Sequence, residues 1–266
     1  MDRSPVVAGQ FYPGHSSELE QMVAGFLPEE EKESALAVVS PHAGYIFSGS
    51  IAGSTFARVK VPKKILILGP NHHGLGHPAA VYPDGNWETP LGKTPIDADL
   101  AARVLEQCPG ATADEQAHSH EHSLEVQLPF VQYLNPQARI VPICLGHMPL
   151  DRLLQMGEAI GGIIASDREE ILMVASTDMT HYESGEQARD KDMDAIERIL
   201  DLDPEGLYST VRERGITMCG VIPTVVMLAA ARRLGASEAR LVHYGNSGDV
   251  TGDQSQVVGY AGLIIR

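Results

Sequence analysis

Four histidines stand just after short apolar runs, where the chain would leave a buried strand and enter a loop. His42 lies in PHAGYIFSG, His72 and His73 lie in PNHHG, and His181 lies in TDMTHYESG. In open α/β sheets the ligand cleft lies beyond the carboxyl ends of the strands, where loops supply the reactive groups. Imidazole nitrogens bind zinc, copper and iron. These residues therefore predict a strand-end cleft that holds a catalytic metal ion, and either histidine of the adjacent pair fits this role.

Three further features suit such a cleft. Asp178 follows the run EILMVAS by two residues. Cys219 directly precedes the stretch GVIPTVVMLAAARRL, and the free amides of a helix start there are expected to lower the pKa of the thiol. The polar segment HSHEHSLEVQLPF precedes an apolar pattern that predicts a helix, and Pro129 is expected to bend this helix or limit its start. The beginning of this segment can close the cleft from another side.

The remaining histidines and cysteines are interpreted as surface or packing residues. Cys108 lies in a Pro-Gly turn, and Cys144 lies inside a predicted strand, where cysteine behaves as a small hydrophobe. The histidines interpreted in this way are His15, His77, His118, His120, His147 and His243.

The elements that must position the cleft follow from apolar runs that alternate with helical patterns. The predicted strands cover residues 35–40, 64–69, 138–146, 170–176, 239–245 and 257–265. The predicted helices cover residues 17–26, 49–59, 97–107, 150–165, 186–200 and 224–234. Most strands are continuous apolar runs, as expected where helices cover both faces of a sheet. We therefore predict one α/β domain over residues 1–266, a three-layer αβα sandwich with a central mainly parallel or mixed sheet.

The composition limits the partners. The 266-residue chain carries 20 Lys and Arg against 35 Asp and Glu, which gives a formal charge of -15, and it has no basic run. A nucleic-acid backbone would be repelled by this charge. No stretch approaches the roughly 18 apolar residues of a membrane span, and the first residues contain no apolar targeting core. We expect a cytoplasmic protein that binds neither nucleic acid nor membrane.

The motifs, taken together and in order, resemble the Memo family, whose prokaryotic members are called AmmeMemoRadiSam system protein B. The resemblance runs from Ala8 to Ile265 and rests on AGQFYP, PHAGYIFSG, LGPNHHG, DEQAHSHEHSLEVQLPF, STDMTHY, MCG and GYAGLII. It implies a fold like that of class III extradiol dioxygenases of the LigB type. It also implies radical-SAM and AmmeMemoRadiSam system partner proteins, with a small-molecule or peptide ligand.

Carried over residue by residue, the resemblance implies three metal ligands. These are His42 of PHAGY, His72 as the first histidine of NHH, and Cys219 of MCG. The dioxygenases hold iron with two histidines and a glutamate, whereas a cysteine takes the third place here. Because a thiolate is a softer donor than a carboxylate, the implied metal is iron or copper, with zinc as a further candidate.

The other cleft residues are given roles in proton transfer or in ligand orientation. His122, His181 and His73 are the candidate catalytic groups, because an imidazole titrates near neutral pH and can donate or accept a proton. Asp178 and Glu121 are the candidates for orienting the ligating imidazoles, and we expect Asp178 to accept a hydrogen bond from one of those rings.

Three functions remain open on the sequence alone. The first is metal-dependent redox chemistry, which would supply or consume a radical or an oxygen-derived species for a partner. The second is a non-enzymatic module whose cleft binds a peptide or a small anion. The third is a zinc-dependent hydrolase in which His122 or His181 serves as general base for a metal-bound water. No feature of the sequence identifies the substrate.

Overall fold

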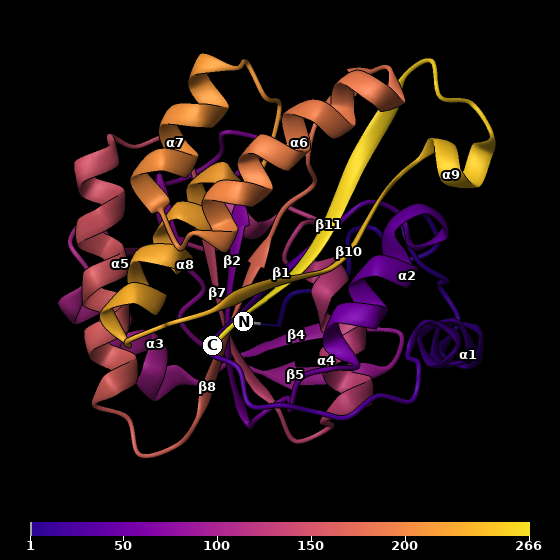
Figure 1. Cartoon of the computed structure of the whole chain (residues 1–266). Coiled ribbons are helices and arrows are strands. Elements are labelled where there is room, and N and C mark those ends of the chain that lie inside the picture. Colours follow the sequence, from indigo (N-terminus) through magenta and orange to yellow (C-terminus); the bar gives the residue numbers. More distant parts are fainter. Residues whose placement is uncertain (1) are drawn as a thin grey trace.

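The computed structural model describes residues 2–266 (Figure 1). Its strands are β1 (Ala37–Ser40), β2 (Lys64–Pro70), β3 (Ala79–Val81), β4 (Asn86–Thr89), β5 (Gly92–Pro95), β6 (Thr112–Ala113), β7 (Arg139–Leu145), β8 (Ile171–Ser176), β9 (His181–Glu183), β10 (Ala239–Asn246) and β11 (Val257–Ile265). Its α-helices are α1 (Ser16–Phe26), α2 (Tyr45–Phe56), α3 (Ala98–Gln107), α4 (Leu128–Leu134), α5 (Leu150–Ala165), α6 (Gly185–Leu200), α7 (Pro204–Glu213), α8 (Val221–Arg233) and α9 (Gly248–Thr251). Short 3₁₀ turns cover Gln116–His118 and Glu125–Gln127.

Every strand and helix predicted from the sequence is present, with its ends shifted by a few residues. Pro129 stands in the first turn of α4, where its missing N–H costs nothing, so it limits the start of the helix as expected. The elements missed are mostly two to four residues long and carry no apolar periodicity. Helix α7 was also missed, although Asp203 caps it by accepting from Gly206 N and a proline opens its first turn.

The central sheet is mixed. Within residues 2–266 its strand order is β10-β11-β1-β8-β2-β7-β3-β6, and β9 pairs with β11. The four strands β1, β8, β2 and β7 are mutually parallel, whereas β11 runs antiparallel to β1 and β3 runs antiparallel to β7. The expected mainly parallel or mixed sheet is therefore confirmed.

The register of the parallel strands aligns their carboxyl ends. Ser40 at the end of β1 pairs with Ser176 at the end of β8, and Leu68 of β2 pairs with Ala175. Because all three strands stop at the same edge, the loops that follow them begin side by side. This edge is where the sequence places its histidines.

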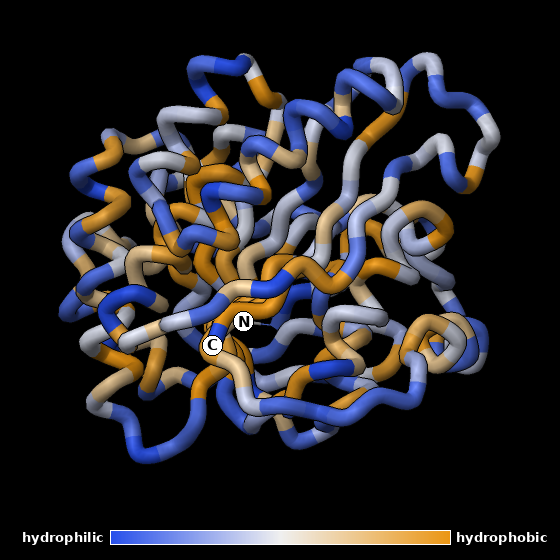
Figure 2. The backbone as a smooth tube through the Cα atoms, in the orientation of Figure 1, coloured by the Kyte–Doolittle hydropathy of each residue, from blue (hydrophilic) through white to orange (hydrophobic). Residues whose placement is uncertain are grey.

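Helices cover both faces of the sheet, which confirms the three-layer sandwich. One layer contains α8, which packs on β1, β2 and β8. Helices α5 and α7 lie against α8 (Figure 1). The other layer contains α2, which packs on β1, β10 and β11 with α1 beside it. The strands form the hydrophobic middle of the molecule, and the turns outside are hydrophilic (Figure 2). No helix among the described residues is long and apolar enough to cross a membrane.

Candidate metal centre

His42 leaves the carboxyl end of β1 and is almost fully buried. Its Nδ1 lies 2.9 Å from Ser176 Oγ. The Ser176 hydroxyl already donates to Ser123 O at 2.7 Å and accepts from Gln127 Nε2 at 2.8 Å. The oxygen can therefore only accept from the imidazole, so Nδ1 of His42 carries the proton and Nε2 of the neutral ring is an acceptor.

His72 follows β2 and is held twice by one carboxylate. Its backbone N donates to Glu121 Oε2 at 2.8 Å, and its Nδ1 lies 2.9 Å from Glu121 Oε1. Glu121 is fully buried. Burial alone would raise the pKa of Glu121, but the hydrogen bonds from His72 lower it well below its usual range, so the carboxylate is ionised. It accepts Nδ1–H of His72, and although burial lowers the pKa of this imidazole, the bond to Glu121 raises it above its usual value. In the neutral ring Nε2 keeps a free lone pair.

His122 completes a group of three imidazoles. Its ring stacks on that of His72 at 4.8 Å between centroids and meets that of His42 edge-on at 5.5 Å. Phe11 covers it at 4.7 Å. One ligating nitrogen from each of the three histidines lies within 4.8 Å of the others. We call His42, His72 and His122 the histidine cluster.

Cys219 lies beside this cluster, immediately before α8. Its Sγ is 3.2 Å from His42 Nε2 and accepts a hydrogen bond from Asp178 N at 3.3 Å. The next residue must be small, because a Cβ on Gly220 would lie 2.3 Å from Thr177 Cβ. The sequence-based assignment of Cys219 as a ligand stays a prediction, and the geometry adds His122 as a candidate ligand.

The expectation of a lowered thiol pKa is wrong for the metal-free chain. Burial raises the pKa of Cys219, and the nearby carboxylate of Asp178 raises it further. Helix α8 begins only at Val221, with Gly220 as its N-cap, so the thiol precedes the first turn whose amides were expected to lower the pKa.

Asp178 binds the backbone of His42, whereas Ser176 binds its ring. Its Oδ1 accepts from His42 N at 2.7 Å, so the expected hydrogen bond to a ligating imidazole is not the one that forms. Burial raises the pKa of Asp178 to about 6, although the hydrogen bond from His42 lowers it. The tautomer of His42 is set by Ser176. In the sequence this residue is only the last position of an apolar run, so nothing there indicates its role.

His181 and His73 lie outside the histidine cluster. His181 opens β9, and its Nδ1 donates to Met179 O at 2.7 Å, which leaves Nε2 as an acceptor. Burial is the main cause of the lowered pKa of His42 and of the raised pKa of Asp178, and His181 is close enough to contribute a smaller effect to both. The exposed ring of His73 lies against that of His120 at 6.1 Å.

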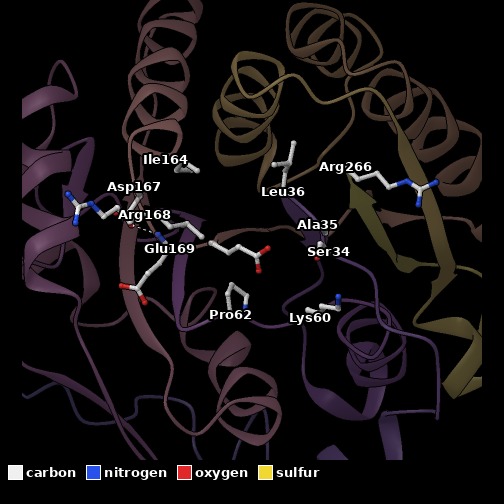
Figure 3. Close-up of a pocket in the computed structure, with 12 residues that line it drawn as sticks. Ser34, Ala35, Leu36, Lys60, Pro62, Ile164, Asp167, Arg168, Glu169 and Arg266 are labelled. Carbon is white, nitrogen blue, oxygen red and sulfur yellow. Dashed lines mark hydrogen bonds between the residues drawn. The ribbon is translucent and has the colours of Figure 1, made fainter.

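A cavity of about 520 Å³ lies at the opposite edge of the sheet (Figure 3). Its lining includes Leu36 and Ile171, at the amino ends of β1 and β8, and Ile164 near the end of α5. It contains no histidine or cysteine, so it offers no comparable set of ligands. We place the candidate site at the carboxyl edge, because the groups that can perform chemistry converge there.

The fold and the site together define a class of protein, an α/β sandwich with histidines and a cysteine converging at the carboxyl edge of its sheet. The comparisons are more specific. Residues 3–264 match the family described as Memo-like protein. The chain therefore belongs to the Memo family.

The relatives are similar over their whole length. A MEMO1 family protein of Methanopyrus kandleri is 44% identical over 281 residues, which cover 100% of this chain and 99% of the relative. One of Aquifex aeolicus is 44% identical with 98% of each chain covered, and one of Methanosarcina acetivorans is 40% identical with 99% of each covered. A solved structure of an uncharacterized protein from Escherichia coli K12 is 15% identical with a TM-score of 0.47, covering 77% of this chain and 87% of that one.

Proposed function

We propose that this chain binds a single iron or copper ion at the histidine cluster and uses it in redox chemistry. The observation that carries the proposal is the convergence of three imidazoles, two of which donate Nδ1–H to protein groups, so that Nε2 of the neutral ring is left for a metal ion. Histidines that bind metals usually donate one ring N–H to a carboxylate, a hydroxyl or a backbone carbonyl, which leaves the other nitrogen for the ion. Cys219 is the proposed fourth donor.

The spacing of Cys219 and His42 fits a shared ion. A metal bonds nitrogen at about 2.0 Å and thiolate sulfur at about 2.3 Å. These lengths together exceed the 3.2 Å between Cys219 Sγ and His42 Nε2, so both atoms can reach the same ion. Binding would also replace the thiol proton, and the charge of the ion would offset the burial that raises the pKa of the thiol.

A bound iron or copper ion would supply electron transfer and a coordination position for a ligand. The chain itself orients and balances the site. The Glu121 carboxylate fixes His72 and compensates positive charge, while Ser176 fixes His42. His181 Nε2 is the proposed acceptor for a proton from a bound molecule, because its other nitrogen is committed to Met179 O.

Metal titration tests the proposal. Iron(II), copper(I) and zinc are titrated without oxygen into wild type and into His42→Ala, His72→Ala, His122→Ala and Cys219→Ser. Loss of one protein ligand should weaken affinity by more than the roughly 10- to 100-fold typical of an orienting group. His243→Ala is the matched control, because His243 is exposed on β10. Equal affinity in all variants would show that these four residues do not bind a shared metal ion.

The identity of the bound metal separates the remaining functions. Oxygen consumption with an added reductant, dependent on bound iron or copper, supports the redox proposal. Zinc as the only tightly bound metal, without oxygen consumption, would favour a hydrolase. No binding of any metal would favour a non-enzymatic binding module.

A further inference from the structure

The N-terminal segment runs along the loop that carries Glu121 and His122, and Arg3 is its anchor. Arg3 is only 6% exposed. Its Nε donates to His118 O at 2.8 Å, and its Nη2 donates to Glu121 O at 2.6 Å. Its Nη1 forms an ion pair with Glu125 Oε2 at 2.7 Å. One guanidinium thus binds three points of the stretch 118–125.

The chemistry of this contact requires arginine. A guanidinium offers five N–H donors in one rigid plane, so it can bind two carbonyls and a carboxylate at once. The ring of Trp87 supports this plane, with Arg3 Cζ 4.1 Å from its centroid. A lysine would keep the positive charge for Glu125 but would lose the fixed arrangement of donors.

The stretch that Arg3 holds is the one that orients two of the three imidazoles. The carbonyl of Glu121 binds Arg3, while its carboxylate binds both the ring and the backbone N of His72. His122 is the next residue. A shift of the backbone at residue 121 would therefore displace both imidazoles, although Arg3 contacts neither ring.

A second tether joins the same two segments. The fully buried carboxylate of Glu125 accepts from Val6 N and Val7 N, and from Tyr12 Oη at 2.6 Å. Between these points Phe11 lies against the ring of His122. The N-terminal segment therefore both holds the loop and covers one of the histidines.

We propose that Arg3 is a positioning residue of the histidine cluster, acting through the backbone of residues 118–125. The part of the proposal that concerns metal affinity rests on the proposed metal function. The part that concerns the positions of the imidazoles rests on their geometry alone. It predicts that loss of Arg3 changes the cluster in protein that is still folded.

The first measurement compares Arg3→Met with Arg103→Met. Arg103 is a matched control, because it also binds a carbonyl, Ile163 O, and pairs with a carboxylate, Asp167, but it lies between α3 and α5. At a temperature where circular dichroism shows every variant folded, Arg3→Met should bind iron(II) or copper(I) about 10-fold more weakly than wild type, at the lower end of the range for groups that orient ligands. Arg103→Met should lower the melting temperature without changing affinity. Arg3→Lys should recover part of the melting temperature and little of the affinity.

The second measurement needs no metal. In metal-free protein with isotope-labelled histidine, Arg3→Met should shift the ring NMR signals of His72 and His122 and leave that of His243 in place, while Arg103→Met leaves all three. If wild type binds no metal, the proposed function fails, and these shifts still decide the role of Arg3. If Arg3→Met lowers only the melting temperature, with ring signals and affinity like those of the control, Arg3 is purely structural and the inference is overturned.

Discussion

Glu121→Gln is the substitution that most directly tests the orientation of His72. The carboxylate receives three donors, which are the ring and backbone N–H groups of His72 and the backbone N–H of Ser123. These donors use both oxygens, so whichever way a glutamine amide is turned, its NH₂ group must face another donor. One charge-assisted hydrogen bond contributes about 1.5–3 kcal/mol. Since about 1.4 kcal/mol corresponds to a tenfold change, metal affinity should fall by roughly 10- to 100-fold.

The assay is anaerobic metal titration of folded protein, with Ser176→Ala and Glu18→Gln measured in parallel. Ser176 orients His42 through a neutral hydrogen bond, which contributes only about 0.5–1.5 kcal/mol, so its loss should weaken affinity less than Glu121→Gln does. Glu18 is exposed on α1 and should have no effect. If Glu121→Gln binds metal as tightly as Glu18→Gln does, the orienting role of Glu121 is refuted.

Two other groups give independent predictions. Burial would raise the pKa of Asp167, but hydrogen bonds from Glu169 N, Lys64 and Arg103 lower it from 3.8 to about 2; because its folded-state pKa is depressed, it contributes stability at neutral pH that is lost as the pH falls through this interval. In urea unfolding measured at a series of pH values, Asp167→Asn should therefore lose this part of the acid dependence, and an unchanged acid slope would contradict it. Cys219 is the most exposed of the three cysteines, so mass spectrometry should find it alkylated first, slowly near neutral pH because its pKa is raised, and bound metal should protect it. Faster alkylation of a buried cysteine would contradict this assignment.

The sequence could predict the layers and the location of the site because both depend on local patterns. The run KILILG is apolar at nearly every position, and the structure buries β2 almost entirely. His72 follows that run, and His42 follows the earlier run ALAVVS. The parallel register then brings the ends of these strands to one edge, as the rule for strand-end clefts requires. Short strands such as β6 escaped prediction because two residues carry no periodicity.

The groups that orient the imidazoles could not be predicted in the same way. Ser176 is the final residue of an apolar run, and its hydroxyl has a role only because Ser123 and Gln127 arrive from a distant segment. Asp178, which looked suited to orient a ring, binds a backbone N–H instead. Which side chain orients which ring depends on hydrogen bonds between segments that are distant in the sequence. A local sequence pattern therefore cannot predict it.

His122 illustrates why the third imidazole is harder to predict than the first two. His42 and His72 inherit their positions from strands that are hydrogen-bonded on both sides, so the sheet fixes where each loop begins. His122 comes from a loop between two 3₁₀ turns, which has no comparable frame of its own. Its ring lies against that of His72, which Glu121 binds, and the carbonyl of Glu121 accepts from Arg3, more than a hundred residues earlier in the chain. The cluster therefore combines two loops whose starting points are set by the sheet with one loop that a buried ion-pair network holds, and only the first kind follows from a local pattern.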